Sequence, residues 1–138
     1  MDYIAEKMLA IRIHNSTRSC ILMRQFNNDI WTLPMVSIPH EADPLYYIDS
    51  VLNQVSGEFK LISAISMIDY VDKDTNDQVR HSVVYDIKYR GKVNPECPDH
   101  CKDIYKKSQW MQVEKLKNRE DLNHPTLVFI ETVESQHI

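Results

Sequence analysis

The most compact group of potential metal ligands in the sequence lies near residue 100. Cys97, His100 and Cys101 stand close together in the chain, and thiolate and imidazole are groups that bind zinc. A fourth ligand would have to come from Cys20 or His81, far away in sequence. Zinc sites commonly combine two pairs of closely spaced ligands, such as two C-x2-C motifs, and this chain has only one such group. The pattern therefore favours free thiols and a surface histidine, with zinc binding as the alternative.

A second group of residues combines cations with aromatic rings. The basic members are Lys102, Lys106, Lys107, Lys115, Lys117 and Arg119. Tyr105 and Trp110 are interleaved with them, and this combination suits a nucleotide base and its phosphate. Carboxylates at 114, 120 and 121 lie in the same stretch, so the preferred interpretation is a solvated surface that balances its own charge. Trp31 and Trp110 are expected to be core anchors, because large aromatic side chains contribute most by burial.

Other catalytic or phosphate-binding motifs are missing. The chain has six histidines, which titrate near neutral pH, but no G-x-S-x-G motif accompanies them. His40 precedes a predicted helix and is the histidine best placed to face a ligand, although a solvated loop residue is the preferred interpretation. With only Gly57 and Gly91 as glycines, a Rossmann loop and a P-loop are excluded.

Length and composition describe an ordinary globular chain. Its 138 residues, 43% hydrophobic and 26% charged, predict a single domain over residues 1–138. A net charge of −4 disfavours nucleic acid and anionic membranes as partners. No apolar run is long enough to span a membrane, and three cysteines without a secretory segment predict reduced thiols and a cytoplasmic protein.

The elements that would position these residues can be predicted from local patterns. Residues 8–13 and 19–24 read as strands joined by a polar turn, 31–34 as a short extended piece, and 35–42 as a stretch without clear periodicity. Alternation predicts long strands over 61–70 and 80–89, separated by a polar loop at 72–78. Residues 94–107 are irregular and polar, 108–113 form a strand, and 125–133 form a final helix. The class is α+β.

The clearest helix begins at Asp43–Pro44. Aspartate caps exposed N–H groups, and proline is tolerated in the first turn. The apolar residues that follow at helical spacing are Leu45, Ile48, Leu52 and Val55. Gly57 stands where a left-handed C-terminal cap is needed.

This order of strand, W-x-L-P, loop, helix and glycine resembles the Nudix hydrolase family. The family motif is G-x5-E-x7-R-E-U-x-E-E-x-G-U, where U is a bulky aliphatic residue. Trp31–Pro34 precedes the motif region, Gly57 matches its last glycine, and Gln109–Leu116 is similar to the family's later tryptophan strand. The resemblance spans roughly residues 5–133 and implies a Nudix α/β/α sandwich around a mixed sheet.

The charged positions of the motif are all replaced. A gap-free alignment from Gly57 places Val36 at the first glycine and Glu58 at the last aliphatic position. The catalytic positions are occupied by Ala42, Ser50, Val51, Gln54 and Val55. In the family the helix glutamates bind the divalent metal, so the resemblance here implies no metal and no catalytic residue. Mg²⁺ would be needed only if Glu41, Glu58 and Glu96 rebuilt a site.

Three functional hypotheses follow. The leading one is a non-hydrolytic binder of a nucleotide-like ligand or a protein partner. The ligand-binding site would be lined by His40, Tyr47, Gln54 and Arg80. The alternative is a divergent metal-dependent hydrolase of nucleoside-diphosphate-linked compounds that uses acids outside the helix. The third is an interaction protein, possible as a homodimer, in which Met35, Val51 and Val55 form an apolar docking surface.

Overall fold

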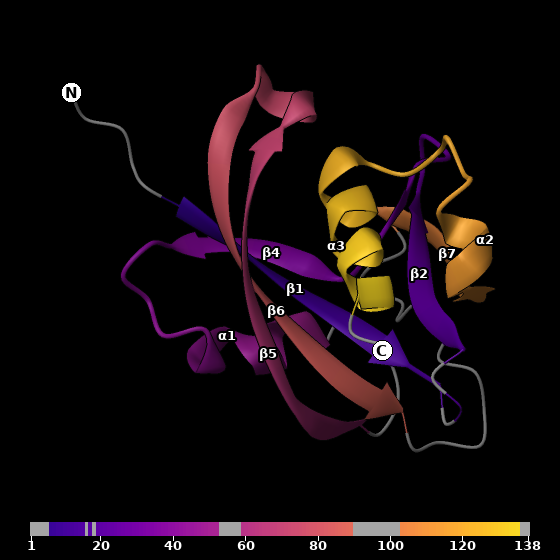
Figure 1. Ribbon diagram of the computed structural model, residues 1–138, viewed down its shortest axis with the longest axis horizontal. Coiled ribbons are helices and arrows are strands. Elements are labelled where there is room, and N and C mark those ends of the chain that lie inside the picture. Colours follow the sequence, from indigo (N-terminus) through magenta and orange to yellow (C-terminus); the bar gives the residue numbers. More distant parts are fainter. Residues whose placement is uncertain (1–5, 16, 18, 53–58, 90–102, 136–138) are drawn as a thin grey trace.

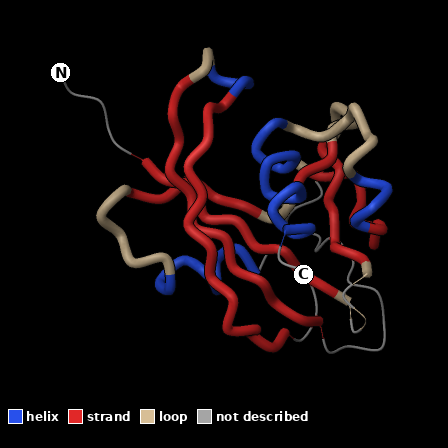
Figure 2. Tube along the Cα trace, viewed as in Figure 1, coloured by secondary structure: helices blue, strands red, loops and turns tan. Residues whose placement is uncertain are grey.

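The computed structural model describes residues 6–15, 17, 19–52, 59–89 and 103–135. The elements in chain order are β1 (Glu6–His14), β2 (Cys20–Phe26), β3 (Trp31–Thr32), β4 (Met35–Pro39), α1 (Leu45–Leu52), β5 (Phe59–Asp72), the 3-10 helix η1 (Lys73–Thr75), β6 (Gln78–Tyr89), β7 (Tyr105–Gln112), α2 (Val113–Leu116) and α3 (His124–Ser135). The described strands form one seven-stranded sheet (Figures 1 and 2).

The sheet has two parts that meet at one end of β1. One part runs β4-β1-β6-β5 and the other β3-β2-β7, and β1 joins β2 where His14 pairs with Ile21. The β1–β6 pair is parallel, from Lys7 opposite His81 to His14 opposite Lys88, whereas the other pairs are antiparallel. The predicted α+β class with a mixed sheet is therefore confirmed.

Alternate residues of β1 face two separate hydrophobic clusters, as the period of a strand requires. The cluster on the α1 side contains Leu9, Ile11, Ile13, Leu22, Ile38, Ile48, Val51, Val83, Tyr85 and Ile87. The other side includes Ala10 from β1 together with Val113 and Leu116 of α2 and Phe129 and Ile130 of α3. Helices thus cover both faces of the sheet, which gives three layers; Figure 1 labels α1 and α3.

Helix α1 begins as the sequence predicts, but a different stripe faces the core. The Asp43 carboxylate accepts a hydrogen bond from the N–H of Leu45 at 3.0 Å, so Asp43 is the N-cap. Ile48 and Val51 are the buried residues of α1, whereas Leu45 is 58% exposed. The expectation that Leu45 belongs to the core stripe is wrong, because the helix packs on the sheet through positions 48 and 51. Gly57 lies outside the described residues.

Strand β4 forms where no strand was predicted, and β7 begins before its predicted limit. Residues 35–39 form β4 and pair with β1, from Ala10 opposite Met35 to Glu6 opposite Pro39. Strand β7 begins at Tyr105, inside a stretch expected to be irregular. Both segments lack an alternating pattern, and hydrogen bonding to a neighbouring strand fixes their conformation instead.

The β5–β6 hairpin projects from the body of the molecule at the top of Figure 1. Asn76 and Asp77 at its tip have φ angles of 58° and 57°, a conformation that Asn and Asp tolerate better than most residues. The Asp74 carboxylate accepts a hydrogen bond from the N–H of His124 at 2.8 Å. This bond ties the tip of the hairpin to the start of α3.

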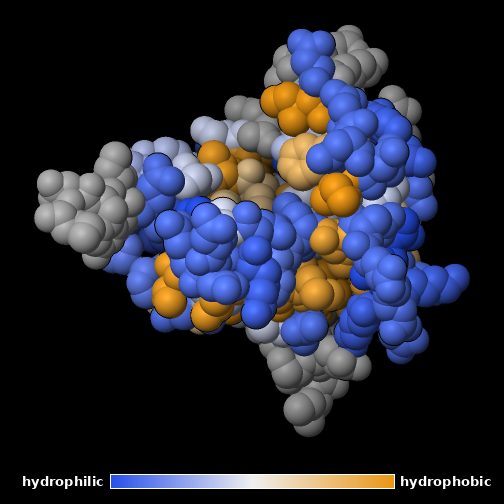
Figure 3. Space-filling view, turned by 90° about the horizontal axis from the view of Figure 1, so that it is seen from above, coloured by the Kyte–Doolittle hydropathy of each residue, from blue (hydrophilic) through white to orange (hydrophobic). Residues whose placement is uncertain are grey.

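The described helices include none that is long and apolar enough to cross a membrane. Seen from above, the surface is mainly hydrophilic, with separate hydrophobic groups between the polar side chains (Figure 3).

Candidate functional site

The face of the sheet beneath α1 is where the resemblance places the catalytic motif. Val51, at a glutamate position of the motif, is fully buried in the α1-side cluster. Val36, at the first glycine position, packs against the same cluster, as does Trp110. Because Val51 lies inside the core, the expectation that it helps form an exposed docking surface is wrong. Met35 packs in the cluster on the other side of the sheet, and Val55 lies outside the described residues.

The remaining motif positions supply no metal ligand where the structure describes them. Ser50 is exposed and Ala42 is half-buried, while Glu41 lies exposed in the loop before α1. Gln54, Glu58 and Glu96 fall outside the described residues. Within the described ranges, no three His, Cys, Asp or Glu side chains are grouped so that they could hold a metal ion. The residues described at this face therefore do not fit Mg²⁺, which requires hard oxygen ligands.

The side chains predicted to line a ligand do not share one face of the sheet. The ring of His40 lies 5.5 Å from the ring of His81, and half-buried Tyr47 packs against the α1-side cluster. Arg80 neighbours His81 in β6, so its side chain points to the opposite face. His40 and Tyr47 thus lie on the α1 side and Arg80 on the α3 side.

Arg80 instead belongs to a polar group near the hairpin tip. Its Nε lies 3.4 Å from the carboxylate of Asp72, which is almost fully buried. Burial and the nearby charge of Asp72 raise the pKa of Tyr70 to about 12. The Tyr70 ring packs edge-on against Phe129 of α3 with 5.5 Å between ring centroids, so this group connects the hairpin to the helix.

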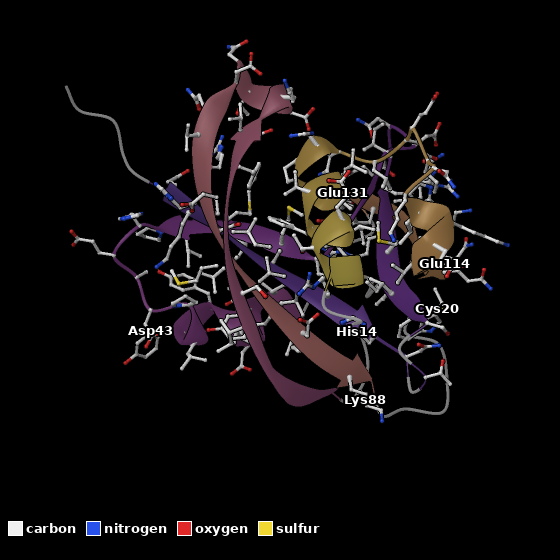
Figure 4. The ribbon with its side chains drawn as sticks, in the orientation of Figure 1. His14, Cys20, Asp43, Lys88, Glu114 and Glu131 are labelled. Atoms are coloured by element: carbon white, nitrogen blue, oxygen red, sulfur yellow. The ribbon has the colours of Figure 1, made fainter. Side chains whose placement is uncertain are left out.

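A buried ionic network occupies the α3 face of the sheet. Arg12 donates hydrogen bonds from Nε and Nη2 to the two carboxylate oxygens of Asp86, at 2.8 and 2.7 Å. His14 Nε2 lies 2.6 Å from the same carboxylate. All three side chains are at most 1% exposed. Arg12 Nη1 also donates to the carbonyl of Phe129 and the hydroxyl of Thr132 in α3, at 3.1 and 2.7 Å; Figure 4 labels His14 beside this helix.

The network determines how Asp86 titrates. Burial alone would raise the pKa of Asp86, but hydrogen bonds and charge from His14 and Arg12 outweigh it, so the pKa lies below its ordinary value. Sequence reasoning missed this cluster. The available signal was that Arg12, His14 and Asp86 occupy inward-facing positions of strands whose other inward-facing residues are largely apolar.

Several residues of the predicted basic and aromatic group make contacts within the protein. Arg24 is fully buried; its guanidinium lies 3.9 Å from the ring centroid of Tyr105 and donates to the Tyr105 hydroxyl at 2.9 Å. The Tyr105 ring stacks on Phe26 at 5.0 Å. Trp31 is 3% exposed, which confirms its predicted role as a core anchor. Lys106 forms an ion pair with Asp29, and Lys102 lies outside the described residues.

Cations also flank the buried Trp31 ring. Lys107 Nζ and the Arg119 guanidinium lie 5.5 and 5.8 Å from its centroid, within the range of a cation–π interaction. Arg119 binds the carboxylate of Asp121 through two hydrogen bonds at 2.8 and 2.7 Å. That pairing raises the pKa of Arg119 and lowers the pKa of Asp121.

A cavity of about 230 Å³ lies between β7 and α2. It is lined by Gln109, Trp110, Met111, Gln112, Lys115, Leu116 and Arg119. Trp110 is half-buried and packs against the α1-side cluster, in agreement with its predicted contribution to the core. Three members of the predicted basic and aromatic group therefore meet in one cavity: Trp110, Lys115 and Arg119.

The predicted zinc ligands are separated where they can be located. Cys97, His100 and Cys101 lie outside the described residues. Cys20 is a half-buried free thiol at the start of β2. His81 lies beside Lys7, near the far end of β1 from the β1–β2 junction, and its Nδ1 lies 2.8 Å from the Asp69 carboxylate.

Known proteins with a similar fold are found by comparing structures, whereas the sequence comparisons find no match. No family model matches the chain, and no curated protein matches it. A MutT protein from Methanosarcina mazei Go1 is similar in structure, with a TM-score of 0.73, 12% identity, and coverage of 99% of this chain and 97% of that chain. A Nudix-family hydrolase from Clostridium perfringens has a TM-score of 0.64 and 12% identity over 94% of this chain and 97% of its own.

The Ap4A hydrolase of C. elegans is a third similar structure. It has a TM-score of 0.65 and 10% identity over 98% of this chain and 100% of that chain. At such low identity the likeness concerns the fold alone, and it extends over nearly the whole length of each protein. Together with the mixed sheet between helical layers, these matches show that the chain has the Nudix fold.

Proposed function

We propose that this protein binds a nucleotide-like ligand without hydrolysing it. The observation that carries the proposal is that Val51 is fully buried in the apolar cluster beneath α1, and that partly buried Val36 packs against the same cluster. Cleavage of a pyrophosphate needs divalent cations that neutralise phosphate oxygens and activate water. A hydrated cation cannot be held by hydrocarbon, and burying a charge there would be costly.

Similarity to nucleotide hydrolases supports the ligand class. The C. elegans protein is an Ap4A hydrolase, and another structure with the same fold, at a TM-score of 0.67, is a UDP-X diphosphatase. Both names describe ligands in which a nucleoside carries linked phosphates. A protein with this fold but without the metal ligands could still bind a nucleotide-like ligand although it could not hydrolyse it.

The test separates binding from turnover. Diadenosine tetraphosphate and UDP-glucose are incubated with the protein and Mg²⁺ or Mn²⁺, and product release is followed by chromatography. We expect no release above the buffer control. Metal-dependent turnover that Glu41→Gln abolishes would overturn the proposal and establish a hydrolase with acids outside α1.

Binding is measured with the same compounds in EDTA. A ligand at 100 times its Kd stabilises the fold by about 2.7 kcal/mol, which raises the Tm by several degrees for a chain of this size. We expect a metal-independent rise in Tm with at least one nucleotide. If a panel of nucleotides, dinucleotides and nucleotide sugars all leave the Tm unchanged, the proposed ligand class is wrong.

A further inference from the structure

His40 and His81 bring two imidazole rings together on the α1 side of the sheet. Their ring centroids lie 5.5 Å apart, and the rings are tilted by 58° to each other. The side chain of His81 is 52% exposed, and His40 is exposed in the turn that follows β4. Both rings are therefore open to solvent, and imidazole nitrogen is the protein group that most often binds transition-metal ions.

A hydrogen bond to Asp69 orients His81 toward His40. The Nδ1 atom of His81 lies 2.8 Å from the carboxylate of Asp69, which is opposite it in β5. The two nitrogens of an imidazole lie on opposite sides of the ring, so Nε2 of His81 faces away from β5, toward β1 and β4. His40 follows β4 and approaches the His81 ring from that side. The Nε2 atom of His81 therefore faces His40.

The Asp69 carboxylate also determines which nitrogen of His81 carries the proton. A carboxylate accepts hydrogen bonds, so the proton of neutral His81 lies on Nδ1 and the lone pair lies on Nε2. The same arrangement of carboxylate and imidazole orients many metal-binding histidines and makes them more basic. His40 forms no hydrogen bond within the described ranges, so its exposed ring can turn either nitrogen toward an ion.

The separation of the two rings fits a single bound ion. Zinc lies about 2.1 Å from an imidazole nitrogen, so a tetrahedral ion holds the centroids of two bound rings about 5 Å apart. The 5.5 Å in this structure is close to that value. The other positions of the ion would be filled by water, because the described residues contain no group of three His, Cys, Asp or Glu ligands. Lys7 lies opposite His81 in β1 and adds a positive charge, which the Asp69 carboxylate offsets.

We infer that His40 and His81 together bind one late first-row transition-metal ion, such as Ni²⁺, Cu²⁺ or Zn²⁺, and that Asp69 positions His81. The ion would join the end of β4 to β6 across the intervening strand β1. Imidazole suits these ions, whereas Mg²⁺ prefers oxygen ligands. The inference therefore does not depend on nucleotide binding or on the absence of hydrolysis.

The experiment titrates the full chain with Ni²⁺ by calorimetry, after EDTA has removed metal and dialysis has removed the EDTA. His40→Gln and His81→Gln should each weaken Ni²⁺ binding at least about tenfold, because the ion then loses one of two linked ligands. The matched control is His124→Gln, since Nε2 of His124 already lies 2.9 Å from the carbonyl oxygen of Val71; this variant should bind Ni²⁺ as the native chain does.

Nuclear magnetic resonance locates the ion directly, because paramagnetic Ni²⁺ broadens the signals of the imidazole rings that it contacts. The His40 and His81 signals should broaden together, at lower Ni²⁺ concentration than the His124 signal. No binding at about 1 mM Ni²⁺, or binding that survives both substitutions and leaves the His40 and His81 signals sharp, would overturn the inference. If each ring bound its own ion, each single variant would keep one ion at unchanged affinity, which would also overturn it.

Two substitutions of Asp69 test its positioning role. Asp69→Asn removes the charge that orients His81 and should weaken Ni²⁺ binding about tenfold, whereas Asp69→Glu keeps the carboxylate and should restore most of the affinity. Equal affinities for Asp69→Asn and the native chain would overturn the role of Asp69.

Discussion

The α1 face and the α3 face of the sheet are both buried, but they bury different chemistry. Beneath α1 the cluster consists of hydrophobic side chains, including Val51 and Val36. Beneath α3 the sheet holds an arginine, a histidine and an aspartate within hydrogen-bonding distance of one another. The charges on the α3 face are stable because β1, β6 and α3 each supply a partner. Among the described residues, the α1-side cluster includes no such set of partners, so a carboxylate placed within it would be an isolated buried charge.

The largest expected effect comes from breaking the ionic network on the α3 face. Asp86→Ala removes the carboxylate that neutralises Arg12 and should lower the free energy of unfolding by about 3–5 kcal/mol. Urea denaturation monitored by circular dichroism measures this. The double variant Arg12→Met Asp86→Leu removes both charges together and should be more stable than Asp86→Ala. Equal stability of the two variants would show that the charges are not coupled.

Acid should remove part of the same stabilisation. The folded-state pKa of Asp86 is depressed, so its contribution is present above the unfolded pKa, near pH 4, and is lost as the pH falls through the folded value. The free energy of unfolding of the native chain should therefore fall more steeply below pH 4 than that of Asp86→Asn. Parallel pH curves for the two proteins would contradict the depressed pKa.

A smaller change tests whether the α1 face is dry. Val51→Thr keeps the shape of the side chain but adds a hydroxyl to the hydrophobic cluster, and should cost about 1–2 kcal/mol of stability. Ser50→Val, at the adjacent exposed position, should change stability by no more than about 0.5 kcal/mol. If Val51→Thr were as neutral as this control, position 51 would be hydrated, as a metal site would require.

The smallest effect concerns a second Asp–His pair, on the surface. Asp69 and His81 lie 2.8 Å apart but remain 66% and 52% exposed. Solvent screens such a pair, so Asp69→Asn should cost no more than about 1 kcal/mol. Comparison with Asp86→Asn contrasts an exposed Asp–His pair with a buried one that also binds Arg12. A loss for Asp69→Asn as large as that for Asp86→Asn would show that burial and the added Arg12 contact do not strengthen the buried pair.

Local signals predicted the framework of the fold but not all of its limits. The cap at Asp43, the alternation of β6 and the hairpin loop follow from short-range chemistry, and the structure confirms them. β4 and the first residues of β7 are strands because β1 and β2 supply hydrogen-bond partners. Partners that are distant in sequence leave no local pattern. For the same reason the exposure of Leu45 depended on how α1 packs on the sheet.

The site was harder to predict than the fold. Motif spacing located Val51 correctly within the helix, but its burial required the neighbouring strands. Arg12 and Asp86 are 74 residues apart, and only the parallel β1–β6 register makes them partners. Trp110, Lys115 and Arg119 were recognised as one basic and aromatic group because they are close in sequence. That they share a cavity depends on the turn from β7 into α2.

The register that joins β1 to β6 also has a consequence for the folding pathway. Arg12 reaches Asp86 across 74 residues and Thr132 across 120, so the network cannot close until three distant segments have assembled. Non-local pairing of this kind slows folding, because the entropy of loop closure is lost before the contacts form. Interactions that form after the transition state mainly retard unfolding. We therefore expect that breaking the buried network speeds unfolding more than it slows folding.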